Sequence, residues 1–122
     1  MTESWTIDGD HLAPGEVVAS LRARIGDGHL ETWLTSSCGR SLAFVTNTER
    51  AMVMLLNEEG DPGEHAVDPA AEGESGGFVL SNGQNDDYAD ADTVPIEGAF
   101  RIVEHVVREG SWPPDAHHVS DH

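Results

Sequence analysis

The segment between Pro95 and Gly110 constrains the fold of this chain more than any other part of the sequence. Proline suits the first turn of a helix and glycine commonly follows its last residue, so residues 95–109 are predicted to be helical. The apolar residues of this segment recur on one helical face: Ile96, Ala99, Phe100, Val103, Val106 and Val107. A helix with one apolar face is stable when that face is buried against another layer. The rest of the chain must therefore supply such a layer.

The second layer is predicted to be a sheet, because several short runs with strand periodicity precede this helix. Residues 29–35 and 41–47 have the two-residue period of strands. The alternating sets are Leu30, Thr32 and Leu34 against Glu31, Trp33 and Thr35, and Leu42 and Phe44 against Ala43 and Val45. Residues 51–57 are apolar on both faces, which is typical of a central strand. The three residues between the last two runs suit a hairpin turn. Residues 77–81 are a fourth strand candidate, and a short fifth surrounds Tyr88.

A second amphipathic helix is predicted over residues 14–25. Residues 58–76 are rich in Gly, Pro, Asp and Glu, so we expect a loop over one end of the sheet. We expect the tail, 113–122, to be partly irregular. With 122 residues and no internal repeat, the chain is predicted to be a single α+β domain, a mainly antiparallel sheet with helices packed on it. The expected core contains Leu42, Phe44, Val53, Leu55, Phe78, Leu80, Phe100 and Val103.

The formal net charge of −17 limits the partners that this chain can have. It excludes unassisted binding to nucleic acid, because phosphates would be repelled, and attraction to an anionic membrane. Residues 51–100 contain twelve acidic residues and neither Arg nor Lys. This one-sidedness favours a partner with a basic groove, such as an enzyme that acts on nucleic acid. Two alternatives stay open: a merely solvated charged surface, and a housekeeping domain adapted to a saline environment.

Catalytic and metal-binding patterns are present only in fragments. Residues 73–77 match the G-x-S-x-G pattern of serine hydrolases, but an acidic loop precedes them and a strand follows, so the required context is missing. Cys38, the single cysteine, has no base near it in sequence that would activate a thiolate. His117, His118 and His122 lie at the chain end, where a rigid metal site is hard to build. We therefore expect no enzyme, no cofactor and no metal. The alternative is a small metal-binding or enzymatic accessory protein that uses Cys38 or these histidines.

The localisation expected from the sequence is cytoplasmic. The first residues have neither the basic region nor the apolar core of a signal peptide. The longest wholly apolar run, residues 51–56, is far shorter than a membrane span.

Residues 80–88 (LSNGQNDDY), followed by Val94-Pro95 and by the helix that ends at Gly110, resemble the Imm1 family of bacterial immunity proteins. The exit from that helix, Gly110-Ser111-Trp112-Pro113, also matches the family's Gly-x-x-Pro pattern, and residues 41–59 resemble its central hairpin. The resemblance covers residues 28–114. The tail departs from the family, whose members often finish with an apolar segment containing Trp.

The resemblance implies a single-domain α+β protein that binds and neutralises a cognate toxin stoichiometrically in the cytoplasm. The expected partner is a basic toxin that acts on nucleic acid, and a deaminase is the class we favour. Such an enzyme has a basic groove and a zinc pocket that receives the target base. We expect a monomer when no toxin is bound.

The contact surface is predicted to centre on residues 82–88, supported by the acidic loop after Leu56. Tyr88 would be an exposed-loop aromatic anchor, and the flanking carboxylates would pair with basic residues of the partner. Alternatively, Tyr88 packs its ring on the sheet while the aspartates stabilise a turn. The predicted toxin-binding residues are Glu58, Glu59, Asp61, Asn82, Gln84, Asn85, Asp86, Asp87 and Tyr88.

Overall fold

The computed structural model describes residues 3–58 and 60–121 of the chain. In chain order the elements are β1 (Trp5–Ile7), β2 (Asp10–Leu12), the 3-10 helix η1 (Pro14–Glu16), α1 (Val17–Gly26), β3 (Glu31–Ser36), β4 (Ser41–Thr46), β5 (Arg50–Leu56), β6 (Glu64–Ala66), β7 (Glu74–Val79), β8 (Asn85–Ala89), the 3-10 helix η2 (Asp90–Asp92), β9 (Val94–Pro95), α2 (Ile96–Glu109) and β10 (His118–Ser120). Neither α1 nor α2 has the length and apolar character that a membrane crossing requires, within these described residues.

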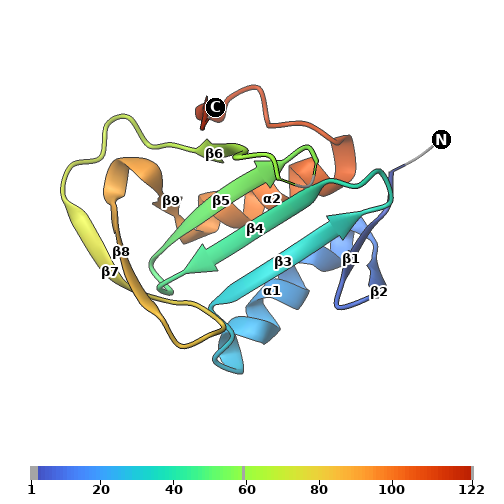
Figure 1. The fold of residues 1–122 in the computed structure, drawn as a ribbon, viewed down its shortest axis with the longest axis horizontal. Coiled ribbons are helices and arrows are strands. Elements are labelled where there is room, and N and C mark those ends of the chain that lie inside the picture. Colours follow the sequence, from blue (N-terminus) through green and yellow to red (C-terminus); the bar gives the residue numbers. More distant parts are fainter. Residues whose placement is uncertain (1–2, 59, 122) are drawn as a thin grey trace.

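The main sheet has the strand order β10-β6-β5-β4-β3-β1-β2, with β9 paired to the start of β5. Neighbouring strands of this sheet pair antiparallel throughout the described residues. Both helices lie behind the same face of the sheet, and the β7–β8 hairpin forms a separate two-stranded sheet beside the start of β5 (Figure 1). The predicted α+β class, a mainly antiparallel sheet with helices packed on it, is confirmed.

Helix α2 confirms the prediction made from its apolar face. It follows Pro95 and ends at Gly110, whose φ of 80° is the left-handed conformation that favours glycine at a helix end. Its buried side chains belong to the hydrophobic core: Ala99, Phe100, Ile102, Val103, Val106 and Val107. The Phe100 ring stacks on Phe44 of β4, with centroids 5.5 Å apart. The helix layer and the sheet are thus joined through aromatic contact.

The core differs from the prediction at two residues. Six of the eight expected side chains lie in it, namely Leu42, Phe44, Val53, Leu55, Phe100 and Val103. Phe78 is fully buried but outside this cluster, and Leu80 is half-buried. The reason is that β7 does not join the main sheet, so its apolar side chains pack elsewhere.

Short strands also appear where a loop or irregular chain was expected. Residues 58–76 are not a continuous loop, because they contain β6 and the first residues of β7. The tail, expected to be partly irregular, includes β10, which pairs with β6. Strands β1 and β2 extend the sheet at its other edge and were not predicted.

Candidate functional site

The helices leave one face of the main sheet uncovered, and a continuous row of side chains crosses it. Trp33 of β3 pairs with Ala43 of β4, Ala43 with Met54 of β5, and Met54 with His65 of β6. Residues paired in this way point to the same side of a sheet. We call this surface the open face; its side chains are Glu31, Trp33, Ala43, Val45, Met52, Met54 and His65.

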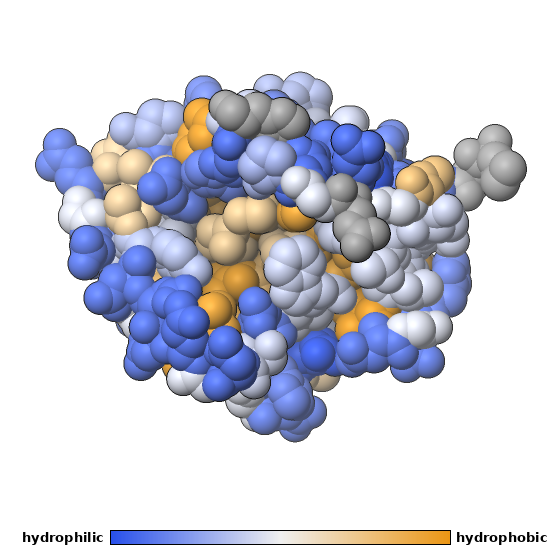
Figure 2. Space-filling view, viewed as in Figure 1, coloured by the Kyte–Doolittle hydropathy of each residue, from blue (hydrophilic) through white to orange (hydrophobic). Residues whose placement is uncertain are grey.

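The open face is apolar at its centre and acidic at its margin. Trp33 is 45% exposed and Met52 and Met54 are half-buried, so these side chains form the apolar surface of this face, whereas Ala43 and Val45 are buried beneath it. Figure 2 looks onto this face and shows apolar surface in the middle, surrounded by hydrophilic side chains. Monomeric proteins seldom expose an apolar patch without a use for it. The open face is therefore the candidate functional site.

The β7–β8 hairpin borders one end of the open face. The Asn47 side-chain amide donates a hydrogen bond to the Gly76 carbonyl (3.0 Å), which ties the hairpin to the β4–β5 turn. A Cβ atom at Gly76 would lie 2.5 Å from a carboxylate oxygen of Asp87, so a larger residue there would displace the Asp87 side chain. Tyr88 meets Phe78 edge to face, with centroids 4.8 Å apart. Its hydroxyl donates to Asp86 (3.1 Å). Burial, followed by Asp86, raises the pKa of Tyr88 to about 12.

Glu31 connects the hairpin to strand β3. Its carboxylate accepts hydrogen bonds from the backbone N–H (3.0 Å) and the hydroxyl (2.6 Å) of Ser81. The Ser81 hydroxyl is the main reason why the pKa of Glu31 lies below its usual value; burial opposes this, and nearby Asp86 also raises it. A side-chain hydrogen bond with Trp33 also lowers the pKa of Glu31, and Glu31 acts electrostatically on Tyr88. Glu31, Asp86, Tyr88 and Trp33 are therefore neighbours, and Glu31 is ionised at neutral pH.

His65, on strand β6 at the margin of the open face, lies between two carboxylates. Its Nδ1 lies 2.9 Å from Asp121 and its Nε2 lies 3.0 Å from Asp92. Burial lowers the pKa of His65, but the two carboxylates together outweigh burial, so the pKa lies above its usual value. These three residues line a hollow of about 230 Å³ together with Met52, Met54, Pro62 and Tyr88.

The predicted contact residues of the hairpin lie close together in the structure. Asn82 and Gln84 are exposed in the turn, where the Asn82 side-chain oxygen accepts from the Gln84 backbone N–H (2.9 Å). On β8, Asn85 and Asp87 are exposed, whereas Asp86 is half-buried. The prediction that Tyr88 lies on an exposed loop is wrong. Tyr88 is half-buried on strand β8, because its ring packs against Phe78.

The predicted acidic loop lies at the opposite end of β5 from the hairpin. Glu58 is exposed just beyond the end of β5, where Leu56 pairs with Ser41. The Asp61 carboxylate accepts hydrogen bonds from the backbone N–H groups of Asn57 (2.9 Å) and Gly63 (3.1 Å), so it stabilises this turn. Glu59 lies outside the described residues. The exposed acidic residues of the two predicted segments therefore lie near opposite ends of β5, although Pro62 of the loop and Tyr88 of the hairpin line the same hollow.

Sequence reasoning missed the residues at the centre of this site: Trp33, Met52, Met54 and His65. A signal was present in two places. The alternation over 29–35 put Trp33 on the side away from the core, and the run 51–57 was apolar on both faces. What the pattern could not show was that neither helix packs on the second face, so that Trp33 stays exposed there and Met52 and Met54 stay half-buried.

The other candidate groups are not assembled into a site. Cys38 is exposed in the β3–β4 turn. The Ser75 hydroxyl donates to Asp90. The His118 ring stacks on Trp112, and His117 is exposed. No group of three His, Cys, Asp or Glu side chains is placed to hold a metal ion in the part of the chain that the structure describes, which omits His122.

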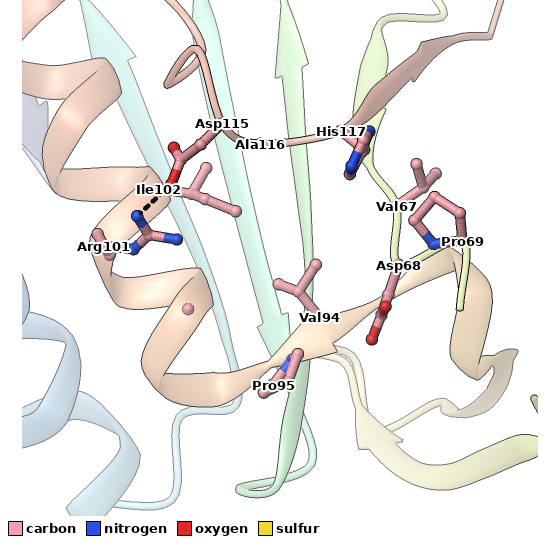
Figure 3. Close-up of a pocket in the computed structure, with 11 residues that line it drawn as sticks. Val67, Asp68, Pro69, Val94, Pro95, Arg101, Ile102, Asp115, Ala116 and His117 are labelled. Atoms are coloured by element: carbon pink, nitrogen blue, oxygen red, sulfur yellow. Dashed lines mark hydrogen bonds and ion pairs between the residues drawn. The ribbon is translucent and has the colours of Figure 1, made fainter. Parts of the chain in front are cut away.

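A larger hollow of about 390 Å³ lies between α2, β9 and the tail (Figure 3). Its walls include Val67, Val94 and Ile102. Its charged groups already have partners, since Arg101 pairs with Asp115 (2.8 Å) and Asp68 pairs with Arg50 (2.9 Å). This hollow therefore offers a ligand mainly apolar contact.

No protein-family model matches the chain, and a search of curated proteins finds no match either.

Proposed function

We propose that this chain is an immunity protein of the Imm1 type, which binds a cognate toxin in the cytoplasm and neutralises it by occlusion. The toxin is a basic enzyme that acts on nucleic acid, and of the enzymes of this kind we propose a deaminase. The immunity protein is a monomer before it binds the toxin. The observation that carries the proposal is the open face, where an exposed tryptophan stands on an apolar surface with an acidic margin.

Aromatic side chains at the centre of an apolar patch are the usual anchors of protein–protein interfaces. Trp33 holds such a position on the open face, with Met52 and Met54 half-buried on the neighbouring β5. Methionine adapts its shape to a partner surface, which suits an interface. Polar and charged side chains at the margin are typical of an interface rim.

The charge distribution supports a basic partner. All six arginines form ion pairs with carboxylates of the same chain: Arg22 with Glu97, Arg24 with Asp8, Arg40 with Glu3, Arg50 with Asp68, Arg101 with Asp115 and Arg108 with Glu104. The surplus of carboxylates gives the net charge of −17. A field of this sign attracts a basic enzyme and speeds its association.

The sequence resemblance supports the proposal from a separate direction. The segment on which it centres, residues 80–88, forms the turn of the hairpin and strand β8, which border the open face. A deaminase needs a basic groove that leads its substrate to a zinc-bound water. An acidic protein can occupy such a groove in place of nucleic acid.

The experiment is a titration against the purified product of the reading frame that adjoins this gene. We expect its activity on single-stranded DNA, first assayed as cytosine deamination, to fall linearly and vanish near one equivalent of the immunity protein. Full protection at a small fraction of an equivalent would mean turnover and contradict occlusion. Absence of inhibition would contradict the proposed function, whereas inhibition of a nuclease would contradict only the choice of a deaminase.

A further inference from the structure

We propose that the margin of the open face beside the hairpin is a receptor for one arginine side chain of the toxin. Its guanidinium would stack on the exposed indole of Trp33 and pair with the carboxylates of Glu31 and Asp86. This inference rests on the proposed function and names the group that the site recognises.

The first step is the shared face of Glu31 and Trp33. They lie two residues apart on β3, so both side chains project from the open face, roughly 6.6 Å apart along the strand. The next residue, Thr32, is buried on the helix side, which confirms the alternation. Ser81 holds the Glu31 carboxylate through two hydrogen bonds, so this anion is already oriented before a ligand arrives.

The second step is the carboxylate that the hairpin contributes. Asp86 accepts hydrogen bonds from the Gln84 side-chain amide (2.6 Å) and from the Tyr88 hydroxyl (3.1 Å), which also orient it. Asp86 lies near enough to Glu31 to act on it electrostatically. Two neighbouring anions repel each other, and a cation placed between them removes this repulsion.

The third step is that, among residues 3–58 and 60–121, every cation that could reach this place already has partners of its own. Arg50 is the arginine of β5 whose position in the strand puts it on this side, and it is occupied by Asp68, Thr93 and Asp90. The nearest imidazole on the open face, His65, is held by Asp92 and Asp121. The positive charge must therefore come from a partner.

The final step separates arginine from lysine. A guanidinium is planar, stacks on an indole and donates to two carboxylates at once, whereas an ammonium is a compact, strongly hydrated point charge. The exposed indole of Trp33 next to two oriented carboxylates matches the planar group. The aliphatic stem of the arginine would lie on the apolar surface of Met52.

The first test uses small probes and does not require the toxin. The ¹⁵N-labelled protein is titrated with N-acetyl-arginine amide, N-acetyl-lysine amide and the uncharged isostere N-acetyl-citrulline amide, while the three indole N–H signals are followed by NMR. Loss of one signal in Trp33→Phe assigns Trp33, and the other two tryptophans serve as internal references. We expect a saturable shift confined to Trp33, largest with arginine and absent with citrulline.

Glu31→Gln should weaken this response at least about threefold. Glu109→Gln is the matched control, because it removes the same charge from an exposed position on α2, in the layer behind the sheet. An equal shift with citrulline, a shift spread over all three indoles, or equal effects of the two Gln variants would overturn the receptor. A lysine response as large as that of arginine would overturn the choice of arginine.

The second test measures the toxin of the adjoining reading frame in the titration described above. Trp33→Ala and Glu31→Gln should raise the Kd at least about tenfold, as truncated interface anchors do, while Glu109→Gln changes it less than about twofold. Equal urea midpoints would show that the variants fold normally. If wild-type protein inhibits and Trp33→Ala inhibits equally well, the receptor is wrong and the proposed function stands. If wild-type protein does not inhibit, the proposed function is wrong, and the arginine titration still decides the receptor.

Discussion

Phe100 joins the helix layer to the sheet, so Phe100→Ala tests the packing of the two layers directly. The side chain is 3% exposed. Its ring lies nearly parallel to that of Phe44, with an angle of 13° between them, and the Arg22 guanidinium lies 4.5 Å above its centroid. Phe44 is fully buried on a central strand, so on that side the structure closes the space that the ring leaves only in part.

Loss of a buried phenylalanine ring costs about 3–5 kcal/mol of unfolding free energy. The stacking on Phe44 accounts for about 0.5–1.5 kcal/mol of this loss. The Arg22 contact adds no more than about 1 kcal/mol, because that side chain is 54% exposed. The free energy of unfolding of a domain is about 5–15 kcal/mol in total. We therefore expect the variant to fold, but with a much smaller free energy of unfolding.

The measurement is equilibrium unfolding in urea, followed by circular dichroism and tryptophan fluorescence. With an m-value of about 2 kcal/mol/M, the midpoint should fall by about 1.5–2.5 M. Arg101→Ala is the matched control on the same helix, since it removes only an exposed ion pair with Asp115 and should cost less than about 1 kcal/mol. A loss below about 1 kcal/mol in Phe100→Ala would refute the described packing of α2 on β4.

The remaining predictions concern charge, pH and backbone conformation. Asp86→Lys combined with Asp87→Lys should slow toxin association about tenfold or more at low salt and much less at high salt; an unchanged rate in stopped-flow measurements would contradict a contact role for β8. The folded-state pKa of His65 lies above its unfolded value of about 6.5, so the stability that His65 contributes is complete below that pH and is lost as the pH rises through the folded pKa. Urea midpoints at pH 6 and pH 8 should therefore differ more for wild-type protein than for His65→Gln. Gly110→Ala should cost about 1–2 kcal/mol because of its φ of 80°, whereas Gly98→Ala, where a Cβ meets nothing within 4 Å, should stabilise α2 by about 0.5–1 kcal/mol. If both substitutions shifted the urea midpoint in the same direction, this difference would be contradicted.

The parts of the fold that could be predicted are those with a strong local pattern. Helix α2 has an apolar stripe between a proline and a glycine, and β3, β4 and β5 have strand periodicity over six or seven residues. Strands β1, β2, β6 and β10 have three residues each, too few for a period to appear. Strands β1 and β2 pair locally, but the pairing of β1 with β3 and of β6 with β10 joins distant parts of the chain, as the contact of His65 with Asp121 also does.

The candidate site was harder to predict, because its residues are brought together only by the register of strand pairing. Trp33, Ala43, Met54 and His65 are separated in sequence, and only the pairing of four strands puts them in one row. The hairpin residues predicted as contacts do lie close together, but Tyr88 was assigned to the wrong environment. The irregularity between Ser75 and Phe78, where two glycines interrupt the pairing, places Phe78 against Tyr88 and so turns that ring inward.

The use of arginine in this chain explains why its acidic margin is available to a partner. Arg40 binds both Glu3 and the Gly110 carbonyl, which ties the N-terminal segment to the end of α2. Arg50 ties β5 to Asp68 and to Thr93, before β9. These arginines hold elements of the fold together, so among the described residues the repulsion between Glu31 and Asp86 is not offset by an arginine of the chain itself. A basic partner that binds there removes repulsion as well as forming contacts. Its binding is therefore linked to the stability of the chain, and it should raise the melting temperature by an amount that grows with the logarithm of the ratio of partner concentration to Kd.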